Sequence, residues 1–267
     1  MPEGRERWSE SDSPLLSRLH RGGAGVLGLV PHERARRGLL RRYRRALHRG
    51  DAVECPLCGE RFRHFMSAWN RPGAICWGCG SHERHRALWL VLHERPELLR
   101  GARSLLHFAP EWCVERQLRP RVGAGYVSAD LEPGKGDRVL DVTALAVGDA
   151  AFDAIICSHV LEHVDDDAVA MRELRRALVP GGWAIVMVPL DLEREQTYED
   201  PSKVTPAQRE AAFWQHDHVR LYGRDLPERL AAAGFEVTTI LPAELVGPER
   251  AARYGLMPEE RVFLCAA

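Results

Sequence analysis

The sequence predicts an α/β fold with a mostly parallel sheet, preceded by a small cysteine-rich module. From Arg100 onward, short apolar runs alternate with helical segments, as is typical of parallel strands that helices cover on both faces. Upstream of these runs, two Cys-x-x-Cys pairs are separated by 17 residues. The 267 residues suffice for one full domain and such a module.

Composition and hydropathy narrow the class of protein further. Hydrophobic residues make up 45% of the chain and charged residues 28%, which supports a packed core and excludes a disordered chain. The apolar run Ala24–Val30 is too short to span a bilayer, and no small-residue cleavage site follows it. We therefore expect a cytoplasmic protein with neither a membrane span nor a signal peptide.

The first 50 residues form a basic N-terminal arm. They contain 12 arginines against 5 acidic residues, although the net charge of the chain is only −1. Within the arm, Arg34–His48 has leucines at helical spacing and arginines on the other face, which predicts a short basic helix. Such a helix either packs its apolar stripe on the main domain or contacts nucleic acid, an anionic membrane surface or an acidic partner.

Residues 51–86 are expected to form a zinc ribbon. In a cytoplasmic protein, two Cys-x-x-Cys pairs indicate a metal site rather than disulfides. Four thiolates suit a tetrahedral Zn²⁺ ion and leave no open position, so the metal is expected to be structural. A redox dithiol and an iron–sulfur site are the alternatives. The expected ligands are Cys55, Cys58, Cys76 and Cys79.

Seven apolar runs predict the strands of the sheet. The last two have no clear helix between them and are expected to pair as an antiparallel hairpin. Only seven residues separate Asp130 from Arg138, fewer than the dozen or so of a helical crossover, so that helix should be missing or shortened. The expected strands are Ser104–Phe108, Tyr126–Ala129, Arg138–Val142, Phe152–Cys157, Trp183–Val188, Glu236–Ile240 and Arg261–Cys265.

Residues 104–267 resemble the type 11-like class I S-adenosylmethionine (SAM)-dependent methyltransferases. Phe152–His163 (FDAIICSHVLEH) is similar to the family's fourth strand and the loop after it, and Leu178–Trp183 (LVPGGW) to its turn into the fifth strand. Tyr222–Phe235 is similar to its helix into the sixth strand. The resemblance implies a Rossmann-like, seven-stranded, mostly parallel sheet in a domain that we place at 87–267. It also implies SAM as cofactor and methyl transfer as activity.

The expected cofactor-binding residues follow the strands, because ligands of open parallel sheets bind beyond the carboxyl ends of the strands. Asp130 is expected to bind the ribose diol, since a carboxylate accepts two hydroxyl hydrogens. The resemblance places Asp141, Val142 and Thr143 around the adenine. The complete set is His107, Ala109, Pro110, Glu111, Asp130, Leu131, Asp141, Val142, Thr143, Ser158 and His159.

The first loop departs from the family's acid-x-Gly-x-Gly pattern. Ala109 and Glu111 stand where glycines would let the backbone approach the cofactor. Glu111 either binds the α-ammonium of SAM or complements the dipole of the next helix. In the second case the loop is a degenerate remnant, and the chain would be a non-catalytic partner-binding module.

Histidines are the candidate general bases, because an oxygen acceptor needs one and His titrates near neutral pH. They are His159 and His163, after the fourth strand, and His218. A structural hydrogen bond is the alternative for His163. The long connection 190–223 is expected to be a lid or binding segment, with a solvated connector as the alternative. Its acceptor-binding candidates are Tyr198, Glu199, His218 and Arg220.

The acceptor is expected to be a small molecule or a glycan-linked metabolite, methylated on oxygen or nitrogen. RNA is the alternative, since a zinc ribbon also precedes the domain in certain rRNA methyltransferases, although this ribbon has few aromatic or Lys side chains. Gly80–Arg86 (GSHERHR) has two interpretations. Glu83, Arg84 and Arg86 dock the ribbon onto the main domain, or the cluster borders the active-site cleft and binds an acidic acceptor.

Overall fold

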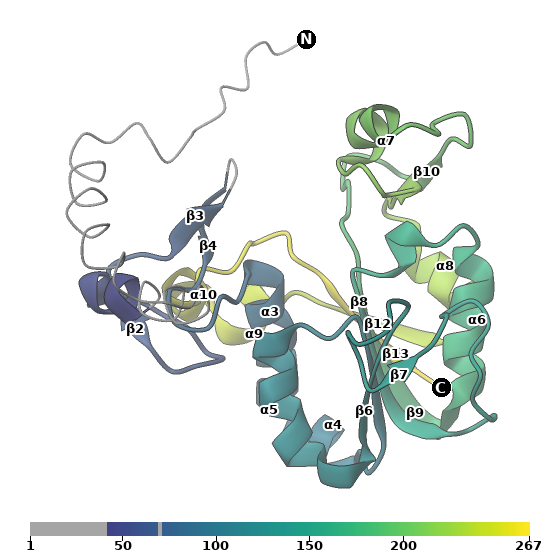
Figure 1. Ribbon diagram of the computed structural model, residues 1–267, viewed down its shortest axis with the longest axis horizontal. Helices are drawn as coiled ribbons and strands as arrows, with labels where there is room; N and C mark the ends of the chain where they lie inside the picture. Colours follow the sequence, from purple (N-terminus) through teal and green to yellow (C-terminus); the bar gives the residue numbers. More distant parts are fainter. Residues whose placement is uncertain (1–41, 69–70) are drawn as a thin grey trace.

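The computed structural model describes residues 42–68 and 71–267 (Figure 1). The predicted basic arm therefore lies largely outside the described residues, and so does most of the helix expected at Arg34–His48. Of that helix, residues 42–47 are described and are helical. Within the described part of the chain, no helix combines the length and the apolar character needed to cross a bilayer.

A seven-stranded sheet forms the centre of the molecule, as predicted. Its strand order is β12-β13-β9-β8-β5-β6-β7. Strand β13 runs antiparallel to both neighbours, and the other pairs are parallel. The strands are β5 (Leu105–Phe108), β6 (Tyr126–Asp130), β7 (Arg138–Val139), β8 (Phe152–Ser158), β9 (Leu178–Met187), β12 (Glu236–Ile240) and β13 (Val262–Ala266).

Two expectations about the sheet need correction. The third strand ends at Val139 rather than at Val142. Strands β12 and β13 do pair antiparallel, but two short helices lie between them, where no clear helix was expected. These are α9 (Pro242–Val246) and α10 (Pro248–Tyr254), and each is too short to leave a helical periodicity in the sequence. The expected absence of a helix between β6 and β7 is confirmed.

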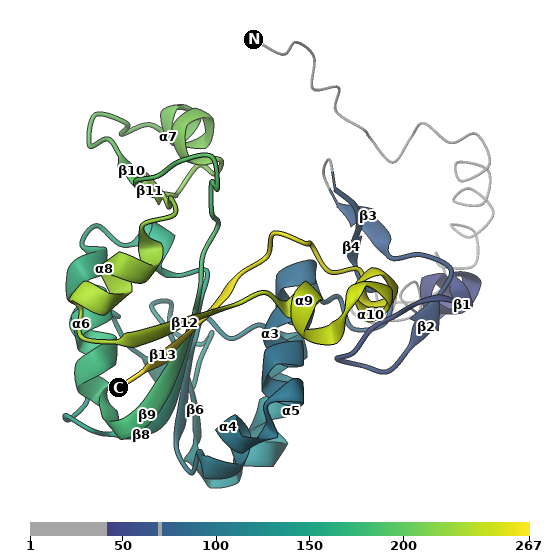
Figure 2. The same cartoon turned by 180° about the vertical axis from the view of Figure 1, so that it is seen from behind.

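Helices cover both faces of the sheet (Figures 1 and 2). Along β5, Leu105 packs into the cluster under α3 and α5, whereas Leu106 and Phe108 pack into the cluster under α6 and α8. The first face carries α3 (Glu83–Glu94), α4 (Pro96–Gly101) and α5 (Trp112–Val122), followed by a short 3-10 turn, Gly123–Gly125. The second face carries α6 (Asp167–Ala177) and α8 (Leu226–Ala232).

The connection 190–223 is structured rather than a plain linker. It rises beyond the carboxyl end of β9 (Figure 1) and contains α7 (Pro206–Phe213). Thr205 begins this helix, because its side chain accepts a hydrogen bond from the amide of Gln208. Strands β10 (Tyr198–Glu199) and β11 (Arg220–Leu221) pair antiparallel and close its base.

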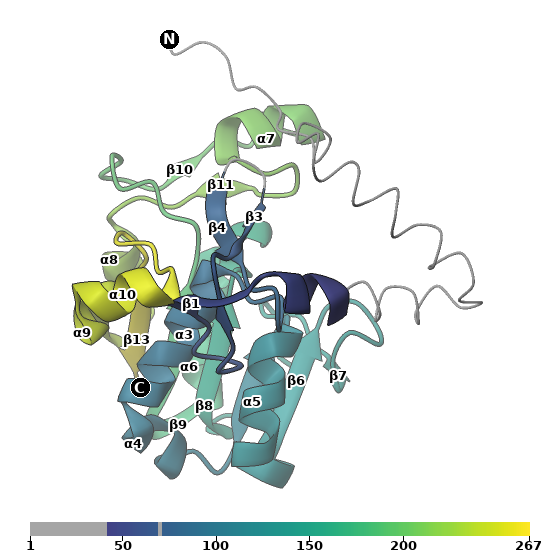
Figure 3. The same ribbon diagram turned by 90° about the vertical axis from the view of Figure 1, so that its left-hand side faces the viewer.

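The cysteine module consists of two small antiparallel ribbons. Strand β1 (Arg49–Glu54) pairs with β2 (Arg61–Phe62), and β3 (Met66–Ala68) pairs with β4 (Arg71–Ile75). The buried cysteines and Phe62 share one hydrophobic cluster with α3 and the sheet. Helices α9 and α10 lie beside α3 and β1 (Figures 2 and 3). The module is therefore packed into the main domain.

Arg86 is the central polar link between module and main domain. It is fully buried on α3 and donates to the carbonyls of Ala74 and Ser81, each at 3.0 Å. It also donates to the carbonyl of Gly255, beyond α10, at 2.8 Å, and its guanidinium lies 4.2 Å from the centre of the Phe65 ring. The docking interpretation of Gly80–Arg86 therefore holds for this residue.

Arg86→Ala should lower the free energy of unfolding by about 3 kcal/mol, because it leaves buried carbonyls without donors. Denaturant unfolding measures the change. The exposed Arg100→Ala on α4 is the matched control and should stay within about 0.5 kcal/mol of the parent. A loss below about 1 kcal/mol for Arg86→Ala would show that the link is dispensable.

Candidate active site

The carboxyl ends of β5 and β8 are adjacent and mark the point where strand order reverses. Strand β5 pairs with β6 on one side and with β8 on the other. The residue that follows each strand has a left-handed backbone: φ is 44° at Ala109 and 55° at His159. Such values are uncommon outside glycine and gather at functional sites. This edge is where an open α/β sheet binds its ligand.

Glu111, directly before α5, places its carboxylate between three elements. Its oxygens lie 3.3 Å from His85 Nε2 of α3 and 3.4 Å from His107 Nε2 of β5. The Ser158 hydroxyl at the end of β8 donates to Glu111 at 3.4 Å. Burial alone raises the pKa of Glu111, but the close approach of the two imidazoles outweighs it and holds the pKa well below its usual range.

The His85 imidazole beside Glu111 has an assignable tautomer. His85 Nδ1 accepts the backbone N–H of His82 at 3.1 Å, so its Nε2 carries the proton that faces Glu111. Burial lowers the pKa of His85, which favours the neutral ring. Among the described residues, no Arg or Lys pairs with Glu111. A buried negative charge therefore remains for a cationic ligand group.

The two acids expected at the nucleoside stand at neighbouring strand ends. Asp130 is half-buried and accepts the amide of Glu132 through Oδ1 at 2.8 Å. Asp141 is exposed and accepts the amide and hydroxyl of Thr143, at 2.8 and 2.7 Å, through Oδ1. Each acid thus has a second oxygen for a ligand. Val142 is buried, and Pro110 is partly exposed beside Glu111.

The β6–β7 side of the site is open, because no helix within residues 71–267 covers it. Leu131, which follows Asp130, is 68% exposed. The β5–β8 edge differs: the contacts of Glu111 with His85, His107 and Ser158 close it. Two surface hollows, of about 430 and 650 Å³, lie over the connection 190–223 and α8 instead of over this edge. A ligand at the edge would displace some of these contacts.

The three candidate bases converge on Glu162, in the 3-10 turn Leu161–His163. His159 Nδ1 lies 3.2 Å from the Glu162 carboxylate. The His163 and His218 rings meet edge to face, with centroids 4.8 Å apart. His218 Nδ1 donates to the carbonyl of Phe213 at 3.0 Å, and burial lowers the pKa of His218. Sequence analysis does not single out Glu162 or His85, since only the folded chain shows which way they point.

The acceptor-side candidates separate into two groups. Arg220 is buried and donates to the carbonyls of Leu161, Val164 and Asp165, and to Glu199 at 2.9 Å. Both charged residues thus fasten the connection 190–223 to the main domain. Tyr198 lines the hollow of about 430 Å³, together with Arg194 and Lys203. Tyr198 is therefore the acceptor-binding candidate that faces an open space. The acceptor-binding roles of all four candidates remain predictions.

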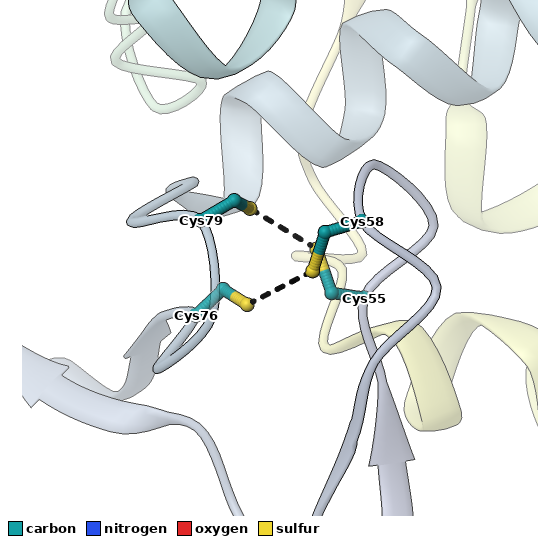
Figure 4. Close-up of side chains that lie close together, drawn as sticks. All are labelled: Cys55, Cys58, Cys76 and Cys79. Atoms are coloured by element: carbon teal, nitrogen blue, oxygen red, sulfur yellow. Dashed lines mark hydrogen bonds between the residues drawn. The ribbon is translucent and has the colours of Figure 1, made fainter. Parts of the chain in front are cut away.

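The four module cysteines meet in space from two loops (Figure 4). Cys55 and Cys79 have sulfurs 3.6 Å apart, and the sulfurs of Cys58 and Cys76 are 3.7 Å apart. In a tetrahedral zinc site with bonds of about 2.3 Å, sulfurs lie about 3.8 Å apart. The side chains therefore fit a metal ion without rearrangement.

The sheet order, with one reversed strand next to its edge, defines the Rossmann-like class I methyltransferase fold. The model of the methyltransferase domain family matches residues 78–240, more than half of the chain. The protein therefore belongs to the methyltransferase domain family. Among curated proteins, none matches this sequence significantly.

Solved structures with a similar fold share little sequence. A SAM-dependent methyltransferase from Mesorhizobium loti is 19% identical, with 68% of this chain and 98% of that chain covered and a TM-score of 0.45. One from Archaeoglobus fulgidus is 12% identical, with 68% and 94% covered and a TM-score of 0.46. The 1,6-didemethyltoxoflavin-N1-methyltransferase of Burkholderia thailandensis is 15% identical, with 67% and 76% covered and a TM-score of 0.44.

Ala109→Gly should leave stability unchanged or raise it by up to about 1 kcal/mol, because glycine relieves the left-handed backbone at φ 44°. Thermal and denaturant unfolding measure the change. The control is Ala129→Gly in β6, which lies in an ordinary extended strand and should lose about 1 kcal/mol. An equal loss for both variants would show that no strain is stored at Ala109.

Proposed function

We propose that the protein transfers a methyl group from SAM to a small-molecule or glycan-linked acceptor, on oxygen or nitrogen. The observation that carries the proposal is the Glu111 carboxylate at the reversal point of the sheet: its Oε2 is buried, and no Arg or Lys pairs with it among the described residues. The α-ammonium of SAM is a cation of suitable size and charge for it. This interpretation favours the first of the two roles expected for Glu111.

The remaining cofactor contacts follow from the strand ends. Asp130 would accept hydrogen bonds from the two ribose hydroxyls through its second carboxylate oxygen. Val142 would pack against the adenine, with Asp141 and Thr143 at its border. When bound, SAM supplies an electrophilic methyl group on its sulfonium. The protein's part is then alignment of the acceptor and exclusion of water.

His159 is the proton acceptor that we assign to an oxygen-directed reaction. It follows β8 directly, beside Ser158, and its Nδ1 faces Glu162. Its Nε2 is buried and has no hydrogen-bond partner among the described residues. That nitrogen is therefore available to accept a proton.

A small-molecule acceptor suits the hollow beside Tyr198. Its volume of about 430 Å³ is within the range of small-ligand sites, roughly 300–1,000 Å³. Arg194 and Lys203 line it and pair with Asp191 and Asp200, so the hollow offers polar groups of both signs to an acceptor. The Tyr198 ring packs against Phe213, whose carbonyl holds His218, so the hollow is connected to the histidine cluster by contact.

The proposal includes one structural zinc ion on Cys55, Cys58, Cys76 and Cys79. The spacing of the four sulfurs supports it. So do Gly59 and Gly80, whose backbones have φ of 70° and 75° and allow each cysteine pair to turn on itself. All seven cysteines are unbridged, which agrees with a reducing, cytoplasmic compartment.

Asp130→Ala should weaken SAM binding by about 10-fold or more, because both ribose hydroxyls lose their acceptor. Glu111→Gln should weaken it comparably, since the amide has no charge for the ammonium group. Isothermal titration calorimetry with SAM measures both. Glu132→Ala, an exposed neighbour of Asp130, is the matched control and should bind as the parent does. A parent protein that does not bind SAM would refute the proposed function.

Zinc removal should unfold the module and lower the melting temperature of the whole chain, because the cysteines share a core with α3. Metal analysis and thermal unfolding with and without a chelator test this. Cys76→Ser should abolish zinc binding at this site. Cys265→Ala, in β13, should retain it. Equal zinc content in both variants would contradict the assignment of the ligands.

A further inference from the structure

A second group of metal-ligating side chains lies beyond the end of β8. Glu162, His163 and His218 each offer a ligand atom, and these atoms lie within 4.8 Å of one another. The three residues come from two segments that are distant in sequence, the turn after β8 and the end of the connection 190–223. The fold brings them together without any help from the cysteine module.

The Glu162 carboxylate lacks the partners that a buried charge requires. The residue is 1% exposed, and neither carboxylate oxygen has a hydrogen-bond partner among the described residues. The nearby Arg220 does not compensate it, because its N–H groups go to backbone carbonyls and to Glu199. His159 Nδ1, at 3.2 Å, is the only charged or chargeable contact recorded for it in the described chain. Such a carboxylate is usually paired or bound to a metal.

The two imidazoles are held as metal-binding imidazoles commonly are. His218 Nδ1 donates to the carbonyl of Phe213, and since a carbonyl only accepts, Nε2 of the neutral ring keeps a free lone pair. His163 Nδ1 lies 3.4 Å from a carboxylate oxygen of Asp217. Carbonyl and carboxylate partners of this kind orient the histidine ligands of metal sites.

We propose that Glu162, His163 and His218 bind one divalent transition-metal ion of the zinc, iron(II) or cobalt class. Two imidazoles and one carboxylate are the ligand set that these ions favour, and they leave coordination positions open. In a tetrahedral site with bonds of about 2.1 Å, the ligand atoms lie about 3.4 Å apart, so the site needs to close by up to about 1.4 Å. His163 is 32% exposed on its side chain, so an ion reaches the cluster from solvent at that residue.

The ion would act beside the methyl-transfer site. An open position would take an oxygen of the acceptor and polarise it, which lowers the pKa of an acceptor hydroxyl and fixes its direction. This role rests on the proposed function, whereas binding of the ion does not. His218 is bonded to the carbonyl of Phe213, and the Phe213 ring contacts Tyr198, which lines the hollow where we place the acceptor.

Titration of the zinc-loaded, full-length protein with Co²⁺ tests the site without SAM or acceptor. Equilibrium dialysis should show a second bound equivalent of metal ion. The visible absorbance of Co²⁺ in that site should lack the bands of thiolate ligands. Glu162→Gln should weaken that equivalent by about 100-fold or more. The matched control His216→Ala removes an exposed histidine next to the cluster and should leave it unchanged. Cys55→Ser should affect only the other site.

Glu162→Gln is the deciding variant, because it keeps the side-chain shape and removes an uncompensated buried charge. Its metal-free melting temperature should equal or exceed that of the parent, whereas added Co²⁺ should stabilise only the parent. His218→Ala should lose the second equivalent as well. Two results would overturn the proposal. The parent protein would bind one equivalent of metal ion, at the cysteines, or the Glu162→Gln variant would still bind the second equivalent. SAM calorimetry on the same samples reports separately on the proposed function.

Discussion

The carboxylate of Glu111 connects the parts of this protein. It lies in a nearly closed space, between imidazoles from α3 and β5 and a hydroxyl at the end of β8. Its charge is partly balanced by N–H dipoles and by no described Arg or Lys. A charge in such a place stabilises the fold less than a paired one would, which supports the ligand-binding role proposed for Glu111.

Helix α3 couples the cysteine module to this centre. Arg86 on one side of the helix joins the module to the segment after α10, and His85, one residue earlier, contacts Glu111. Docking is therefore supported for Arg86, whereas binding of an acidic acceptor by this cluster stays a prediction. A change in the cysteine-bearing loops would reach the strand ends through the first turn of α3. The module is thus a support for the site as well as for the fold.

Much of the sheet could be predicted from sequence, because each buried strand leaves a continuous apolar run, as Ile155 and Ile156 do in β8. The meeting of the cysteines followed from their spacing. The contacts of Arg220 could not be predicted from the sequence. An arginine in a polar connection suggests a ligand contact, whereas in the folded chain the Arg220 side chain turns inward and donates to three carbonyls. Glu162 and His85 lie within the motifs FDAIICSHVLEH and GSHERHR, but the sequence assigns them no role of their own, because their contacts depend on the packing of the folded chain.

A crystal structure of the protein with S-adenosylhomocysteine tests the central claim most directly, because this product keeps both the α-ammonium and the ribose. The account predicts density beyond the ends of β5 and β8, with the ammonium against Glu111, the ribose hydroxyls on Asp130, and the contacts that close the edge opened. Density confined to the hollow beside Tyr198, or an undisturbed Glu111 cluster at saturating ligand, would contradict it.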